Sequence, residues 1–109
     1  MKNRIIVEAN SEYIPAQSNP VKEEYFFSYN IKIINNSNQR AKLLSRYWHI
    51  TDGLGNSEDI HGPGVVGKTP KIRPGESFSY TSFCPIKTPL GSMEGSFRLV
   101  NEDKREFEV

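Results

Sequence analysis

Apolar and polar residues alternate along most of this sequence, and no ten-residue window has a convincing helical period. The clearest case is segment 25–33, where one side of the alternation holds Tyr25, Phe27, Tyr29, Ile31 and Ile33. A helix would scatter these side chains around its axis, whereas a strand places them on one face. The pattern therefore predicts a β-strand with one buried face, and a fold built from strands of this kind.

The same alternation recurs in further segments, which are 4–9, 43–51, the weaker 56–61, 77–82, 93–99 and 105–109. Turn-forming residues separate them, as in NNSNQ, DGLGN, RPGE, TPLGS and NEDK. In RPGE, Pro74 presets φ and Gly75 is expected to take the positive-φ position. Short strands at this spacing predict an all-β fold, an immunoglobulin-like or fibronectin type III-like sandwich of about seven antiparallel strands.

The length of 109 residues fits one domain, so residues 1–109 are predicted to form a single β-sandwich. Cys84 is the only cysteine, which excludes the disulfide-linked sandwich and favours the fibronectin-like one. It also favours a reducing compartment. Trp48, in the middle of its strand, suits the core tryptophan of such a fold.

The inward positions predict a core made of Tyr25, Phe27, Tyr29, Ile31, Ile33, Leu44, Trp48, Ile50, Phe78, Tyr80, Phe97 and Leu99. A bulge in 25–33 would bring Phe26 and Ile34 inward instead. Arg46 falls between Leu44 and Trp48 on the predicted inner face. Its charged group is therefore expected either to reach the sheet edge or to pair with a carboxylate inside.

The charges nearly cancel, with 14 basic and 13 acidic residues, so we expect no attraction to nucleic acid or to acidic membranes. The N-terminal segment has only three consecutive apolar residues. A signal peptide needs a longer apolar run, and a membrane span needs about twenty such residues. These features predict a soluble, cytoplasmic protein.

The segment HGPGVVGK contains Gly62, Gly64 and Gly67 at the G-x-G-x-x-G spacing of a dinucleotide-binding loop. Such a loop must be followed by a helix, but Pro70 and Pro74 forbid a continuous helix here. The acidic residue expected about twenty positions later is missing, and no Gly-Lys-Ser/Thr ending marks a P-loop. The glycines are therefore predicted to shape a long connection between the two sheets.

An anion site of another kind stays open in the same loop, because residues 61–75 contain no acid. Consecutive backbone N–H groups between Gly62 and Gly67 could form an anion-binding nest beside several cations. We expect such a site to be weak and shallow. Its candidate ligand-binding residues are His61, Gly62, Gly64, Gly67, Lys68, Lys71 and Arg73.

The sequence offers little for catalysis. Only His49 and His61 could act as a base for Cys84, and no cysteine-protease motif surrounds this residue, so an inert, half-buried thiol is expected. The two histidines fit no zinc pattern, and DGLGNSED lacks the spacing of a calcium loop. We therefore predict no enzyme activity, no metal site and no cofactor, and rank a hydrolase using Cys84 or a metal last.

Several segments together resemble the ApaG family. LLSRYW, ITDGLG, GPGVVG, PGESFSYTS and TPLGSMEGSF occur in the order and spacing of that family, and PAQSNP and YFFSYNIKI resemble the start of its domain. The resemblance implies a fibronectin type III-like sandwich in which the glycine loop is not part of a Rossmann unit. One departure is Phe83, where the family often has glycine.

The resemblance also implies an association with dinucleoside polyphosphate metabolism or with cobalt and magnesium tolerance. ApaG-like domains in eukaryotes occur in an F-box protein and in a DNA polymerase delta-interacting protein. We therefore expect a non-enzymatic module that binds a protein partner, or a second copy of itself, by a sheet edge or by its loops. The alternative is a binder of a pyrophosphate-containing ligand or a metal–phosphate at loop 61–73.

Overall fold

The computed structural model describes residues 4–109, most of which lie in β-strands. The strands are β1 (Ile5–Tyr13), β2 (Tyr25–Asn35), β3 (Ala41–Asp52), β4 (Ser57–Pro63), β5 (Lys71–Ile72), β6 (Ser77–Ile86), β7 (Gly91–Asn101) and β8 (Glu106–Glu108). Two single 3₁₀ turns, η1 (Pro15–Gln17) and η2 (Pro20–Lys22), connect β1 to β2. Within residues 4–109, no helix is long and apolar enough to cross a membrane.

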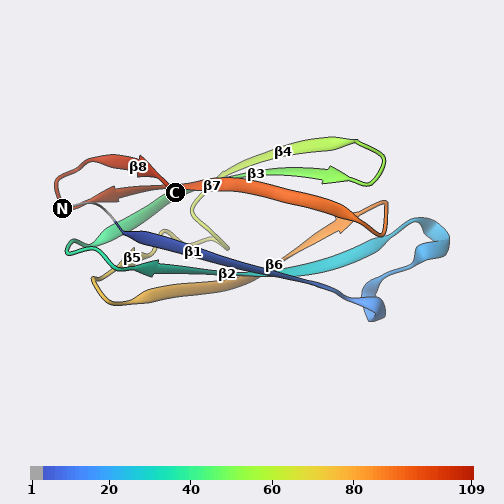
Figure 1. Ribbon diagram of the computed structural model, residues 1–109, viewed down its shortest axis with the longest axis horizontal. Helices are drawn as coiled ribbons and strands as arrows, with labels where there is room; N and C mark the ends of the chain where they lie inside the picture. The colour runs from blue at the N-terminus through green and yellow to red at the C-terminus, as the bar shows by residue number, and fades with distance from the viewer. Residues whose placement is uncertain (1–3) are drawn as a thin grey trace.

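The strands form two antiparallel sheets that lie one above the other along the long axis of the molecule (Figure 1). The first sheet has the order β1-β2-β6, and the second has the order β4-β3-β7-β8. The short strand β5 also pairs with β3, beyond the end of β4. This arrangement confirms the prediction of an all-β sandwich. It leaves β1, β6, β4, β8 and the short β5 as edge strands.

The core lies between the two sheets and contains six of the predicted residues, namely Ile31, Ile33, Trp48, Tyr80, Phe97 and Leu99. Trp48 packs edge-on against Phe97, with ring centroids 5.8 Å apart. Tyr29, Ile50 and Phe78 are only partly buried and pack against this core. Tyr25 and Phe27 are also only partly buried, and their rings lie beside Tyr13 of β1 rather than against this core.

The predicted burial of Leu44 is wrong, because β3 contains a bulge. The register with β7 passes from Leu43 opposite Leu99 to Ser45 opposite Arg98, which leaves Leu44 as the extra residue. An extra residue reverses the alternation of side chains. Leu43 is therefore fully buried in place of Leu44. No such irregularity interrupts β2, whose pairing with β1 and β6 is continuous.

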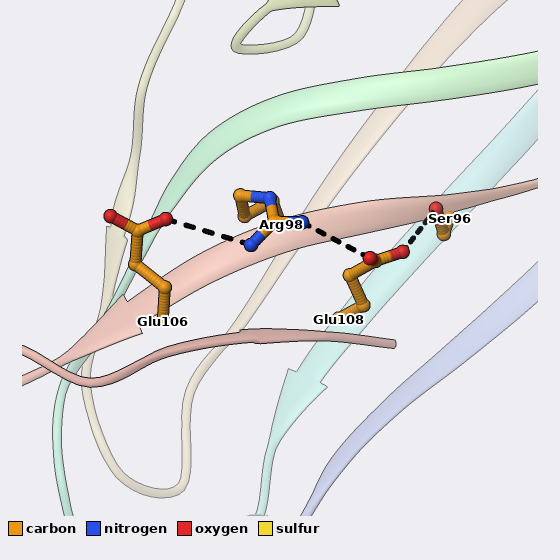
Figure 2. Close-up of polar contacts among 4 residues, drawn as sticks. All are labelled: Ser96, Arg98, Glu106 and Glu108. Carbon is orange, nitrogen blue, oxygen red and sulfur yellow. Dashed lines mark hydrogen bonds and ion pairs between the residues drawn. The ribbon is translucent and has the colours of Figure 1, made fainter.

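β8 closes the edge of the larger sheet by pairing with β7. Arg98 contacts Glu106 at 3.6 Å and Glu108 at 3.1 Å, and the Ser96 hydroxyl donates to Glu108 (Figure 2). These charged side chains are about half exposed, and ion pairs of this kind stabilise a protein by about 1 kcal/mol at most. Backbone bonds between Phe97 and Val109 and the packing of Phe107 hold the strand more firmly.

Candidate functional site

The predicted glycine loop is a tight hairpin after β4. Val65 and Lys68 exchange two backbone hydrogen bonds of 2.8 Å, and the residues between them, Val66 and Gly67, have φ values of 43° and 78°. Two positive φ values in a two-residue loop are typical of a type I′ turn. The turn leads into β5 rather than into a helix. The loop therefore lacks the helix N-terminus that a dinucleotide-binding loop presents to a pyrophosphate.

Arg46 packs against Gly62 and bonds the backbone beside it. The Arg46 guanidinium lies 2.8–2.9 Å from the position that a Cβ of Gly62 would occupy. It donates from Nη1 to the carbonyl oxygens of Pro63 and Gly64, at 3.1 and 2.9 Å. Arg46 therefore reaches across the edge strand β4, which is the first of the two alternatives stated for it. It has no carboxylate partner among residues 4–109.

The loop does not itself cross between the sheets, contrary to the prediction. β4 and β5 both pair with β3, so the hairpin stays on the larger sheet. The crossing occurs at the turn Arg73–Glu76, where Gly75 has the predicted positive φ, at 84°. Gly75 then donates to the Asn35 carbonyl at the end of β2, in the smaller sheet. The pairing of β5 with Ala41 and Lys42 moves the crossing to this later turn.

The seven candidate ligand-binding residues are spread over three neighbouring elements. Gly62 belongs to β4, and the hairpin contains Gly64, Gly67 and Lys68. Lys71 belongs to β5, and Arg73 lies in the turn after it. His61 lies against the Tyr47 ring, with centroids 4.6 Å apart. The N–H groups of Gly64, Val65 and Lys68 already donate to carbonyl oxygens. Anion binding by this loop stays a prediction.

Val66 has a strained backbone, because a β-branched residue is rarely found at positive φ. We expect Val66→Asn to raise the free energy of unfolding by about 1 kcal/mol, since Asn-Gly is the preferred pair in type I′ turns. Urea unfolding measures this effect. Leu90→Asn is the control, because Leu90 is also exposed and its φ is not positive. Equal or lower stability of Val66→Asn would show that the turn is not strained.

A second feature, not predicted, is a cleft of 730 Å³ between the two sheets. It opens where edge strands β4 and β6 leave the sandwich uncovered, and it is lined by residues of β3, β4, β6 and the hairpin. Its lining includes Trp48, Tyr80 and Arg46. The sequence pattern places all three on inward positions of their strands, but only the pairing of distant strands shows that they face one cleft.

Cys84 also lines this cleft and is not an activated nucleophile. Burial raises the pKa of its thiol, and the carboxylate of Glu58 adds to this effect. The thiol therefore stays protonated at neutral pH. His49, one of the two possible bases, is hydrogen-bonded to Asp59. No group of three metal-ligating side chains occurs among the described residues either.

A polar cluster on β3 and β4 was also not predicted from the sequence. The Asp59 carboxylate accepts from the Tyr47 hydroxyl at 2.8 Å and lies 2.6 Å from Nδ1 of His49. The hydrogen bond with His49 has the largest effect in lowering the pKa of Asp59, followed by the hydrogen bond with Tyr47. The same bond between Tyr47 and Asp59 raises the pKa of Tyr47. The spacing of Tyr47 and His49 was the only available signal. Within residues 4–109, the hydrogen-bond partner of this histidine is Asp59 and not a nucleophilic side chain.

Comparisons with known proteins agree with this geometry. The family model of the ApaG domain matches residues 15–101. A protein named ApaG from Azoarcus sp. strain BH72 is 49% identical over 106 residues, 97% of this chain and 84% of the relative. Another, from Shewanella pealeana, is 48% identical over 96% of this chain and 83% of the relative. The crystal structure of the putative ApaA protein from Bordetella pertussis superposes with a TM-score of 0.96 at 41% identity, covering 98% of this chain and 87% of that one. The chain belongs to the ApaG family.

Proposed function

We propose that this protein is a cytoplasmic, non-enzymatic interaction module that binds a protein partner along the free edge of β6. One observation carries the proposal: β6 is the only edge strand of the described structure without a charged residue. The edge strands β1, β4 and β8 each contain two or more charged side chains. Charges on an edge strand oppose pairing with another chain, so their absence favours it.

The register indicates which backbone groups of β6 are free. The Asn35 N–H donates to the Glu76 carbonyl directly opposite, at 2.9 Å. In an antiparallel ladder, pairs that exchange hydrogen bonds alternate with pairs that do not. The even-numbered residues of β6 therefore bond to β2. Ser79, Thr81 and Phe83 direct their N–H and C=O groups to the free edge.

Phe83 supplies an apolar contact beside these groups. Its side chain is 54% exposed and stacks on Phe26 of β2, with ring centroids 5.4 Å apart. Pro85 is the next residue of β6 whose backbone faces the free edge. It has no N–H, so pairing with a partner strand is expected to end there. A partner strand is therefore expected to pair with residues 79–83 and to cover the Phe83 ring.

The first experiment tests where the partner binds. A photo-crosslinking residue is placed at position 79 on β6 and, as a control, at position 8 on the charged edge β1, in protein expressed in its native host. We expect a crosslinked protein from position 79 and none from position 8. Equal crosslinking from both positions would contradict binding at β6. A second copy of this chain as the product would make the module a homodimer.

The second experiment measures affinity for the crosslinked partner. Phe83→Lys is expected to weaken binding at least tenfold, or about 1.4 kcal/mol, because it adds a charge to the edge and removes the aromatic contact. Leu90→Lys is the matched control, since it removes an exposed apolar side chain outside β6. Unchanged affinity of a folded Phe83→Lys variant would overturn the proposal.

Binding of a pyrophosphate-containing ligand or a metal–phosphate at loop 61–73 is the second candidate. It is supported by the four basic side chains of this loop and by the lack of any acid from 61 to 75. A role connected with dinucleoside polyphosphates or with cobalt and magnesium tolerance would follow from such binding. Calorimetric titration with a dinucleoside polyphosphate tests it. Binding that is lost in the Lys68→Ala, Lys71→Ala double variant would favour the loop.

A further inference from the structure

Two buried polar atoms in the inter-sheet cleft have no partner. Nε1 of Trp48 and the hydroxyl of Tyr80 each expose less than 1 Å² and make no hydrogen bond to the described residues. Leaving a buried donor unpaired costs about 1–3 kcal/mol. Both side chains are 8% exposed and belong to the core, so local mobility does not explain them. A buried group without a partner in a cleft points to a partner from outside the chain.

Arg46 brings a positive charge to the same place. It is two residues from Trp48 on β3 and lines the same cleft. Its Nη1 donates to two backbone carbonyls, and no carboxylate neutralises it within residues 4–109. The guanidinium therefore brings a positive charge that no side chain of the described residues pairs.

The Tyr80 phenol is a neutral donor beside this charge. Burial raises its pKa well above the ordinary value, and the opposite effects of the Arg46 charge and the Trp48 indole do not overcome it. The effect of Trp48 is that of an indole N–H directed toward the phenol oxygen, although the two groups do not meet hydrogen-bond geometry. An indole N–H and a guanidinium can only donate, and the phenol has a proton to give. Side chains that can each donate a hydrogen bond therefore line one cleft, and the group that complements them is an oxyanion.

We propose that the cleft binds a small organic anion, whose carboxylate or phosphate group is held by Arg46, Trp48 and Tyr80. Its volume of 730 Å³ lies within the usual range of small-molecule sites. Ile50, Ile60 and Ile86 line it and would contact the apolar body of the ligand. Asp52 and Glu58 also line it and would repel a second anionic group. The ligand therefore carries one anionic group, unlike a dinucleoside polyphosphate.

The ligand must move a side chain to reach the two buried atoms. Arg46 is the flexible part of this wall, because its long side chain is anchored only by the two carbonyl contacts at Nη1. An oxyanion that bonds the free guanidinium nitrogens can draw this side chain aside and enter. The inference differs from partner binding at β6, since it uses the inward side chains of the strand, although Phe83 borders both the cleft and the free edge.

Trp48 is the only tryptophan, so it provides a direct measurement of binding. The protein labelled with ¹⁵N has one indole N–H signal, which shifts when that N–H gains an oxyanion acceptor. Benzoate, phenyl phosphate and inorganic phosphate are titrated in turn. We expect a saturable shift with benzoate or phenyl phosphate, and the stronger of the two distinguishes a carboxylate ligand from a phosphate ligand. Inorganic phosphate, without an apolar body, is expected to bind at least tenfold more weakly.

Tyr80→Phe is the decisive variant, because it removes only the unpaired hydroxyl. It is expected to keep or increase the thermal stability and to weaken binding at least tenfold. Tyr47→Phe is the matched control, since its hydroxyl bonds Asp59 and does not line the cleft. It should bind as the wild type does. Arg46→Gln is expected to abolish binding, and its folding is checked by the backbone spectrum.

Three results would overturn the inference. The first is an indole signal that no probe shifts, which would leave the unpaired donors without a ligand. The second is a shift that persists unchanged in folded Tyr80→Phe. The third is binding that moves only backbone signals of residues 61–73, which would assign the anion to the glycine loop. Crosslinking of a partner from position 79 that persists in Tyr80→Phe would separate this site from the β6 edge, since residue 79 does not line the cleft.

Discussion

Replacing Asn35 by alanine is expected to lower the free energy of unfolding by about 3–5 kcal/mol, since the four hydrogen bonds of its buried side chain are lost at once. Asn35 is fully buried at the end of β2. Its side-chain amide donates to the carbonyl oxygens of Gln39 and Ile72, both at 2.8 Å. Its Oδ1 accepts from the backbone N–H and the hydroxyl of Ser37, at 2.9 and 2.6 Å.

These contacts explain the size of the expected effect. They connect the β2–β3 turn with β5, which is 37 residues away in the chain from Asn35. Alanine would leave the Ile72 carbonyl in the interior without this donor and would create a cavity. Asn38→Ala is the matched control, because Asn38 lies in the same turn and is exposed. Urea unfolding of both variants should give a large loss for Asn35 and almost none for Asn38. Similar values for the two would contradict this account.

Replacing Gly64 by alanine is expected to cost about 2–4 kcal/mol of stability, from positive-φ strain and from steric overlap together. Gly64 has φ of 59°, and an added Cβ would overlap the backbone carbonyl of Lys68. It would also lie 3.1 Å from Cγ2 of Thr69. Relieving this steric overlap would require the hairpin to open and the hydrogen bond from the Gly64 N–H to the Leu44 carbonyl to break.

Gly67→Ala separates the two causes, because Gly67 has φ of 78° and open space where its Cβ would lie. It should cost about 1 kcal/mol, from the backbone conformation alone. Lys68→Ala should change stability by less than about 0.5 kcal/mol, since an exposed charge contributes little. Thermal unfolding in this series tests whether the glycines serve backbone geometry. Equal effects at Gly64 and Gly67 would refute the role given to packing.

Much of the fold could be predicted because it depends on local chemistry. The alternation in β2 persists without interruption, so Ile31 and Ile33 are buried as expected. Gly75 follows Pro74 and takes positive φ, since that turn requires it. Pro70 and Pro74 exclude a helix after the glycine loop from their covalent structure alone. Family membership was also recognisable, because its motifs lie within short segments.

The candidate site depended on contacts between distant segments. The bulge at Leu44 arises where β3 meets β7, and nothing in LLSRYW predicts that its alternation reverses. The two-residue strand β5 is too short to have a pattern and exists through its pairing with β3.

The amino-acid sequence by itself determined the longer strands, most turns and the family, because each rests on the conformational preferences of neighbouring residues. The tertiary structure alone decided that Arg46 and Trp48 of one sheet meet Tyr80 of the other in a cleft. It also decided that β6 is an edge strand without charged residues. The physical reason is that unpaired donors and free edges are defined by what the rest of the chain leaves uncovered.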